Sequence, residues 1–293
     1  MYDADANRLL ETFQHRSPVL DGCFVDDTQV VGGGLDCSVI LRDVETKNKD
    51  IVGSHEKAVR CLEYARSMGL IVSGSWDQTV KLWDIREKTP LIATASQPGK
   101  VFTMSVTGHR LVVGTSGNRV VVWDLRATDA PLENRTSSLK HMTRVIRCFP
   151  DGSGYAVGSV EGRVAVEYLS EEEQKNKYAF KCHRETDDES TTVYPVNALA
   201  FHPIYGTFAS GGCDGTICIW DGAHKKRLCQ LAHHPVGISS LAFNRDGRIL
   251  AAASSYTFEE GEKEKRSSEN IYLHPIQEAQ VKPKPRKRKK ETN

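Results

Sequence analysis

The pattern SGSWDQTVKLWD at Ser73–Asp84 recurs in altered form about every 40 residues, and this period constrains the fold more than any other feature. In each copy a strand of small apolar residues leads through a tight turn to a second strand that ends on a closing pair. The closing pairs are Arg42-Asp43, Trp83-Asp84, Trp123-Asp124, Glu167-Tyr168 and Trp220-Asp221, and a weaker copy runs from Ile238 to Leu273. The period predicts an all-β fold, the WD-repeat β-propeller, in which each repeat forms one four-stranded blade.

The clearest copy also contains polar residues in a pattern that indicates a structural network. Asp77 lies in the turn, where its side chain can bond to its own backbone. In WD-repeat propellers such an Asp joins a His, a Ser or Thr and a Trp in a buried hydrogen-bond network. The matching positions are held by His55, Ser73, Asp77 and Trp83. These are residue types found in catalytic sites, but their place in the repeat predicts a structural role.

Length and composition fit one domain. The 293 residues are 39% hydrophobic, and we expect a single propeller over residues 1–281 followed by a basic tail at 282–293. No apolar stretch approaches the roughly 18 residues needed to cross a membrane, and the start of the sequence is acidic and polar. We therefore expect no membrane partner and no signal peptide.

The motifs needed for catalysis or metal binding are missing from the sequence. None of the eight cysteines forms a C-x-x-C pair, so the sequence predicts no metal site and no cofactor, and the thiols are expected to be small buried side chains. No nucleophile elbow, phosphate-binding loop or zinc-protease motif is present. The sequence therefore predicts a protein that is not an enzyme.

The charge of the chain is unevenly distributed. The net charge is +1, but residues 282–290, KPKPRKRKK, contain seven basic side chains, which leaves the preceding residues at −5. Such a tail cannot bury a core and is expected to be disordered. It is typical of a nuclear localisation signal, of a nonspecific contact with nucleic acid, or of a solubilising end. We expect no sequence-specific nucleic-acid partner.

Five segments carry a resemblance to a known family. They are GSWDQTVKLWD at Gly74–Asp84, VEGRVAVEYL at Val160–Leu169, KYAFKCHR at Lys177–Arg184, YPVNALAFHP at Tyr194–Pro203 and ASSYTFEEGE at Ala253–Glu262. Together they resemble the spindle-assembly-checkpoint propeller of the "budding uninhibited by benzimidazoles" (Bub-type) family over essentially the whole folded chain. The second and third segments are the most specific, because the propeller architecture does not require them.

The resemblance implies a non-catalytic scaffold that is nuclear and reaches kinetochores in mitosis. Its implied partners are checkpoint kinases, bound through their GLEBS motifs, phosphorylated Met-Glu-Leu-Thr (MELT-type) repeats of a kinetochore scaffold, and the assembly that inhibits the anaphase-promoting complex. A related propeller, the messenger-RNA-export adaptor that binds a nucleoporin GLEBS motif, has a similar EGRVA segment and a similar CHR. An RNA-export adaptor is therefore the alternative function, and a scaffold of an unrelated complex is a third.

Arg163 is the residue that departs most clearly from the repeat. It follows the turn glycine Gly162, and an arginine there can hold a carboxylate by two parallel hydrogen bonds. By resemblance it is the arginine that pairs with glutamates of the GLEBS peptide. The alternative is an ordinary ion pair within the chain, with Glu161 or Glu167.

Two further groups are candidates for binding peptides. Lys181, His183 and Arg184 form a basic cluster in the insertion that lengthens one repeat interval, and clustered Lys and Arg suit a phosphate. The resemblance assigns this segment to contacts with the phosphorylated repeats, whereas the alternative is a solvated loop. Trp76 lies in a turn where the repeat does not need a large ring, so it could receive an apolar partner side chain or pack on a neighbouring turn.

The number of repeats departs from the family. The Bub-type propeller has seven blades, yet this sequence contains six recognisable repeats, and Tyr2-Asp3 resembles the closing pair of a further one. We expect a seven-bladed family member whose first blade is mostly missing, either through a truncated gene model or in a real isoform. A six-bladed arrangement is the alternative.

Overall fold

The computed structural model describes residues 1–3, 6, 8–258, 261–262 and 269–283. Contacts divide the chain into two compact units, Met1–Val196 and Asn197–Asn293. Nearly all regular structure is β-strand. The predicted basic tail lies outside the described residues from position 284 onward.

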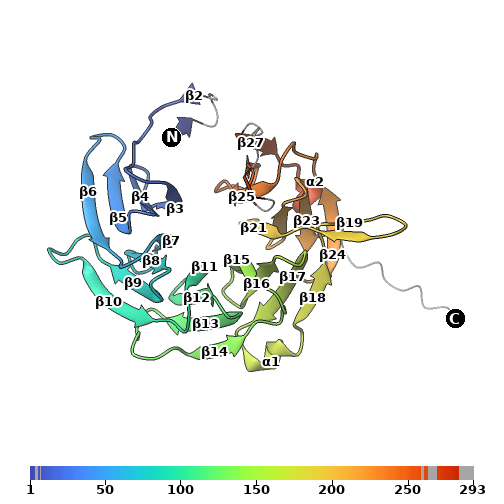
Figure 1. Cartoon of the computed structure of the whole chain (residues 1–293), viewed down its shortest axis with the longest axis horizontal. Helices are drawn as coiled ribbons and strands as arrows, with labels where there is room; N and C mark the ends of the chain where they lie inside the picture. Colours follow the sequence, from blue (N-terminus) through green and yellow to red (C-terminus); the bar gives the residue numbers. More distant parts are fainter. Residues whose placement is uncertain (4–5, 7, 259–260, 263–268, 284–293) are drawn as a thin grey trace. The chain divides into compact units, whose positions relative to one another are not determined.

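The first unit contains four antiparallel four-stranded sheets in which strands follow one another in chain order (Figure 1). Their strands are β3 (Val19–Phe24), β4 (Gln29–Gly34), β5 (Ser38–Asp43) and β6 (Lys49–Ser54); β7 (Val59–Ala65), β8 (Leu70–Ser75), β9 (Thr79–Trp83) and β10 (Leu91–Ser96); β11 (Val101–Thr107), β12 (Arg110–Thr115), β13 (Arg119–Asp124) and β14 (Glu133–Thr136); and β15 (Thr143–Cys148), β16 (Gly154–Ser159), β17 (Arg163–Tyr168) and β18 (Tyr178–Lys181).

Two small hairpins and one short helix complete the first unit. The strands β1 (Tyr2–Asp3) and β2 (Arg8–Leu9) pair with each other, as do β19 (Arg184–Thr186) and β20 (Thr191–Val193). The helix α1 (Glu171–Gln174) connects β17 to β18. The hairpin β19–β20 follows β18, the last strand of the fourth large sheet.

The second unit contains one four-stranded and one three-stranded sheet. Their strands are β21 (Val196–Phe201), β22 (Phe208–Gly212), β23 (Ile217–Asp221) and β24 (Lys226–Gln230), and β25 (Ile238–Phe243), β26 (Ile249–Ser254) and β27 (Asn270–Pro275). The helix α2 (Glu278–Val281) follows β27 and buries Val281. Neither α1 nor α2, the helices of the described residues, is long and apolar enough to cross a membrane.

The strand boundaries agree with the repeat. Each closing pair marks the end of a third strand, as Asp43, Asp124, Tyr168 and Asp221 end β5, β13, β17 and β23. Among the described residues the fold is therefore a WD-repeat β-propeller fold with six blades, one for each sheet of three or four strands. The predicted pair Tyr2-Asp3 forms β1, which pairs with β2 in a two-stranded sheet.

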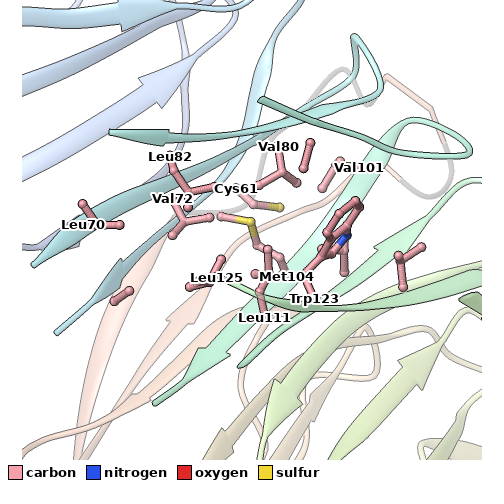
Figure 2. Packing of buried hydrophobic residues seen from close by; sticks show 14 residues of the cluster. Cys61, Leu70, Val72, Val80, Leu82, Val101, Met104, Leu111, Trp123 and Leu125 are labelled. Atoms are coloured by element: carbon pink, nitrogen blue, oxygen red, sulfur yellow. The ribbon is translucent and has the colours of Figure 1, made fainter. Parts of the chain in front are cut away.

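Alternation along each strand creates the core between neighbouring sheets. On β8, Leu70 and Val72 belong to the cluster shared with β11–β13, whereas Ile71 belongs to the cluster shared with β3–β6. Successive side chains of a strand point to opposite faces, so one strand serves two cores. Figure 2 shows the first cluster, where Val72 and Leu82 lie opposite Met104 and Trp123.

Small residues on the second strand allow the sheets to approach each other. A Cβ added to Gly74 of β8 would lie 2.7 Å from Cγ1 of Val101 on β11. Hydrogen bonds then join the innermost strands, since Thr103 Oγ1 accepts from the Ile146 N–H at 2.9 Å and Ser105 Oγ from the Cys148 N–H at 3.0 Å. Sheet β15–β18 is therefore fixed against sheet β11–β14.

Candidate peptide-binding surface

The turn between β16 and β17 holds the predicted residue Arg163. Gly162 has a φ of +61°, which glycine adopts without strain, and an added Cβ would lie 2.8 Å from the Cys182 carbonyl oxygen. The Cys182 N–H donates to the Gly162 carbonyl at 2.9 Å. The turn is therefore packed tightly against the segment that follows β18, and Arg163 begins β17 from a fixed position.

Arg163 makes an ion pair within the chain and keeps access to solvent. Its Nε lies 3.5 Å from Oε2 of Glu161, and the Arg163 side chain is 36% exposed. The other partner considered from sequence, Glu167, is 2% exposed and accepts from the Tyr155 hydroxyl at 3.0 Å and the Ser138 N–H at 3.2 Å. The internal pair therefore forms with Glu161, in a geometry that leaves Arg163 at the surface.

Lys181 lies opposite Arg163 and Arg184 contacts the turn before it, but only Arg184 lies in the predicted insertion. The sequence interpretation placed the whole KCHR segment in an insertion, and this is wrong for Lys181, which ends the regular strand β18 directly opposite Arg163. The insertion itself is the β19–β20 hairpin, which begins at Arg184. The interval is long because an extra hairpin follows a complete blade, a difference that spacing alone does not reveal.

Arg184 and His183 face inward more than the sequence suggests. The Arg184 Nη2 donates to the carbonyl oxygens of Glu161 at 3.1 Å and Gly162 at 3.2 Å. His183 is 5% exposed. Arg184 therefore supports the backbone of the turn that presents Arg163, while the exposed Lys181 is available to a ligand.

Trp76 lines a small cavity rather than standing free. It follows β8 and is half-buried, and the cavity of about 150 Å³ is lined by Arg60, Trp76, Phe102, Met142, Thr143 and Arg144. Neither an apolar pocket wall nor the two arginines are required by the repeat. The cavity has the combination of aromatic and arginine side chains that dominates protein interfaces.

The segment 141–144 connects the cavity with the turn. The Val160 N–H donates to the Met142 carbonyl oxygen at 3.1 Å, and His141 Nε2 lies 4.0 Å from Glu161 Oε2. Trp76 and Arg163 are not in direct contact in any interaction observed among the described residues, but this segment touches both places. We call the whole the basic surface, defined by Arg60, Trp76, Phe102, Met142, Arg144, Arg163, Lys181 and Arg184.

Sequence reasoning missed Arg60, Phe102, Met142 and Arg144. Arg60, Phe102 and Arg144 each occupy the second position of an innermost strand, in β7, β11 and β15. A position-by-position comparison of the repeats would have shown that these three equivalent sites carry large side chains. The basic surface contains five cationic residues, with Glu161 as the neighbouring anion, so it suits an acidic ligand.

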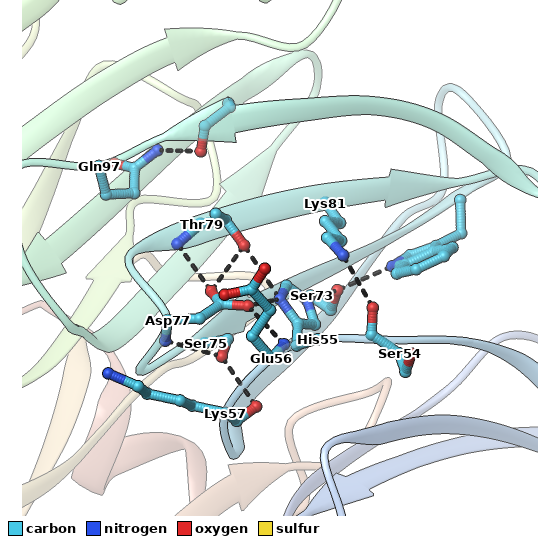
Figure 3. Close-up of polar contacts among 12 residues, drawn as sticks. Ser54, His55, Glu56, Lys57, Ser73, Ser75, Asp77, Thr79, Lys81 and Gln97 are labelled. Carbon is cyan, nitrogen blue, oxygen red and sulfur yellow. Dashed lines mark hydrogen bonds and ion pairs between the residues drawn. The ribbon is translucent and has the colours of Figure 1, made fainter.

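The residues of the predicted network form a continuous set of hydrogen bonds that joins the sheet β7–β10 to His55, which lies between β6 and β7 (Figure 3). His55 Nδ1 lies 2.9 Å from Asp77 Oδ2 and Nε2 lies 2.7 Å from Ser73 Oγ, which also accepts from Trp83 Nε1 at 2.7 Å. A carboxylate can only accept, so Nδ1 carries a proton and Nε2 accepts from the serine hydroxyl.

Burial and charge hold this network in one protonation state. Burial lowers the pKa of His55, and the nearby Asp77 opposes that change only in part. Burial alone would raise the pKa of Asp77, but hydrogen bonds from Thr79, the Glu56 N–H and His55 outweigh it and lower the pKa. Ser73 is fully buried, so its hydroxyl is closed to a substrate. Among the described residues, no group of three or more His, Cys, Asp or Glu is arranged to hold a metal ion.

Comparison with known proteins places this architecture in a family. The WD domain, G-beta repeat model matches residues 47–84, 176–221 and 225–257. The chain is 52% identical over 293 residues to Mitotic checkpoint protein BUB3.1 of Arabidopsis thaliana, covering 98% of this chain and 86% of that protein. It is 47% identical to Mitotic checkpoint protein bub3 of Dictyostelium discoideum, covering 94% of this chain and 84% of that protein.

A relative with a different role is also similar. The Poly(A)+ RNA export protein of Schizosaccharomyces pombe is 38% identical to the chain, covering 94% of this chain and 80% of that protein. The checkpoint relatives above match at higher identity. By this identity and coverage, the chain belongs to the Bub3 family of WD-repeat mitotic checkpoint proteins.

Proposed function

We propose that this protein is a non-catalytic scaffold of the spindle assembly checkpoint whose basic surface binds acidic peptide segments. The proposed ligands are the GLEBS motifs of checkpoint kinases and the phosphorylated MELT-type repeats of a kinetochore scaffold. Binding both kinds of segment would bring the kinases to kinetochores in mitosis. The same role places the protein in the nucleus and near the assembly that inhibits the anaphase-promoting complex.

The observation that carries this proposal is the grouping of cations around one rigid turn. Arg163 and Lys181 are cross-strand partners, and Arg184 bonds to the backbone on the other side of the turn. A phosphate carries about −1.5 to −2 charges at neutral pH, and arginine can bind either phosphate or carboxylate through two hydrogen bonds. A fixed turn keeps these donors in place before the ligand arrives, which reduces the entropy lost on binding.

The cavity at Trp76 supplies the apolar part of the same surface. An acidic peptide that crossed Arg163 could insert an aliphatic or aromatic side chain between Trp76, Phe102 and Met142, with Arg60 and Arg144 on either side. Such a pocket excludes water around the ion pairs and strengthens them. The proposed contact residues are therefore Arg163, Lys181 and Trp76, with Arg184 as support for the turn.

The same surface also supports an alternative function, an mRNA-export adaptor that binds a nucleoporin GLEBS motif. The similarity to an RNA export protein over most of the chain favours keeping this candidate. Both functions use an acidic peptide, so the basic surface alone does not separate them. The two functions are separated by which kind of peptide the protein binds more tightly.

Calorimetric titration of the purified protein with three peptides tests the proposal. They are a GLEBS segment of a checkpoint kinase, a phosphorylated MELT-type peptide and a nucleoporin GLEBS segment. We expect the first two to bind, and Arg163→Glu to weaken both by at least about tenfold, equal to about 1.4 kcal/mol. The charge-matched control is Arg66→Glu, because Arg66 is exposed and follows β7 at the end away from Arg60. Preference for the nucleoporin peptide would move the assignment to RNA export, and equal loss in both variants would remove the role of Arg163.

A further inference from the structure

A second concave site lies at the opposite end of the sheet that carries Arg163. It is a cleft of about 450 Å³ between sheets β11–β14 and β15–β18. Its lining is formed by Arg110, Val122, Leu132, Glu133, Gly152, Ser153, Leu169, Ser170 and Glu173. Strand β16 runs from this cleft to the turn before Arg163, and at about 3.4 Å per residue the two sites are about 20 Å apart. We call this site the outer cleft.

The apolar wall of the outer cleft is preformed. Leu132 is 52% exposed beside the buried Val122, and the Leu132 N–H donates to the Val122 carbonyl at 2.8 Å. On the other side the Leu169 N–H donates to the Ser153 carbonyl at 2.9 Å. Backbone hydrogen bonds therefore fix both leucines in place, although the side chain of Leu132 is largely exposed to solvent. The cleft therefore presents one aliphatic side chain to solvent from a concave position.

The positive charge of the cleft belongs to Arg110, which shares one carboxylate with a second arginine. Arg110 Nη1 lies 3.6 Å from Asp124 Oδ2, and Asp124 also accepts from Arg126 Nε at 2.9 Å and Nη2 at 2.7 Å. The hydrogen bonds from Arg126 hold the pKa of Asp124 well below its usual range, so this carboxylate stays ionised. Arg110 and Arg126 therefore share a single carboxylate, on the side of the cleft formed by β12 and β13.

The negative charge lies on the side of the cleft formed by β14 and α1. Glu133 Oε2 pairs with Arg135 Nη2 at 3.1 Å. Glu173 is exposed on α1 and makes no ion pair with another described residue. Its two helical neighbours Glu171 and Glu172 are exposed as well, but they do not line the cleft. The exposed charge on the α1 side of the outer cleft is therefore negative, whereas the charge of the basic surface is positive.

We propose that the outer cleft binds a peptide segment of a second partner in which an aliphatic side chain is flanked by Lys or Arg. The aliphatic side chain contacts Leu132, Val122 and Leu169, and a neighbouring cation pairs with Glu173 and with the free oxygen of Glu133. Since the basic surface selects acidic segments, one molecule can hold two chemically different partners at once. The inference does not depend on which acidic peptide the basic surface binds.

Fluorescence anisotropy with short synthetic peptides tests this inference. The probe has two central leucines flanked on each side by Lys and Arg, and two matched probes replace the leucines by Gly or the basic residues by Glu. We expect the double variant Glu133→Gln, Glu173→Gln to weaken the basic leucine probe by about fivefold, the effect of one or two partly exposed ion pairs. Leu132→Ser should weaken the same probe to a similar extent and leave the glycine probe unchanged.

Three controls make the result decisive. Glu171→Gln with Glu172→Gln removes the same charge from the same helix without touching the cleft, and should change the affinity by less than about twofold. Arg163→Glu should leave the basic leucine probe unaffected. Circular dichroism melting curves establish that every variant folds. Equal binding of the glycine probe, equal effects of the two glutamate pairs, or no binding of the basic leucine probe to the wild-type protein would each overturn the inference.

Discussion

The two ends of sheet β15–β18 border sites of different chemistry. At one end Arg163, Lys181 and Arg184 gather around a glycine turn, and at the other Leu132, Glu133 and Glu173 border the outer cleft. Between them β16 is entirely buried. The repeat therefore determines the strands and their core, while the turns and the short additions at each end are free to acquire separate binding chemistry.

A change in the shared core should affect both ends, and it should have the largest effect. Ile146 is fully buried on β15 and packs with Val112, Val157 and Ala165. We expect Ile146→Ala to lower the free energy of unfolding by about 3 kcal/mol, because it removes buried methyl groups and leaves a cavity. Urea denaturation measures this loss. If acidic and basic probes then lost affinity unequally, the idea of two sites on one rigid sheet would be wrong.

Gly162→Ala should separate the two ends. The added methyl group would have to displace the Cys182 carbonyl, and alanine disfavours the positive φ of this position. We expect a destabilisation of about 1 to 2 kcal/mol and a weaker affinity for acidic peptides. The basic leucine probe should bind as it does to the wild-type protein, as measured by anisotropy on the same sample. A matched loss of both probes would contradict the separation.

Arg184→Gln should show a smaller effect at the same end. The variant removes the hydrogen bonds to the Glu161 and Gly162 carbonyls but leaves Arg163 and Lys181 in place. We expect a loss of about 1 kcal/mol in stability, the usual size of such bonds, with a several-fold weaker affinity for acidic peptides. Lys181→Gln is the comparison variant. Because Lys181 is exposed, this substitution should reduce the affinity for acidic peptides without reducing the stability of the protein. Loss of stability in the second variant alone would reverse these roles.

A histidine pair in the second unit, Asn197–Asn293, provides a pH-dependent control for the comparison of the two ends of sheet β15–β18. His234 Nδ1 donates to the Gly215 carbonyl at 3.0 Å, so its Nε2 accepts from His274 Nε2 at 2.9 Å. Burial, with the neighbouring His234, lowers the pKa of His274. A lowered histidine pKa means that the stabilisation is present above the unfolded pKa near 6.5 and is lost as the pH falls through the folded pKa.

We therefore expect wild-type stability to fall by about 1 kcal/mol more than that of His274→Gln as the pH is lowered from 7 to 5. Hydrogen exchange should place the extra opening between Gly215 and Pro275. Peptide binding by sheet β15–β18 should not follow this titration. A wild-type protein that loses no more stability than the variant would show that the histidine pair contributes nothing.

The sequence predicted the strand ends and the turn at Arg163, which the repeat shows directly. It did not predict the sites that form where neighbouring sheets meet. The closing pairs located the strand ends, and the break in the repeat at Arg163 located the turn of the basic surface. The KCHR segment was misplaced because spacing does not distinguish a complete fourth strand, β18, from the hairpin that follows it. The cavity at Arg60, Phe102 and Arg144 was missed because it joins residues of three sheets. The outer cleft was missed for a similar reason, since Leu132 directly precedes β14 whereas Glu173 lies on α1, which follows β17.

The most direct test of the central claim is a charge exchange across the basic surface. The binding of a checkpoint-kinase GLEBS peptide and of its counterpart with glutamates replaced by arginines is measured by calorimetry for wild-type protein and for Arg163→Glu. We predict that the variant binds the natural peptide at least about tenfold more weakly and regains part of that affinity with the reversed peptide. Unchanged affinity of Arg163→Glu for the natural peptide would contradict the account.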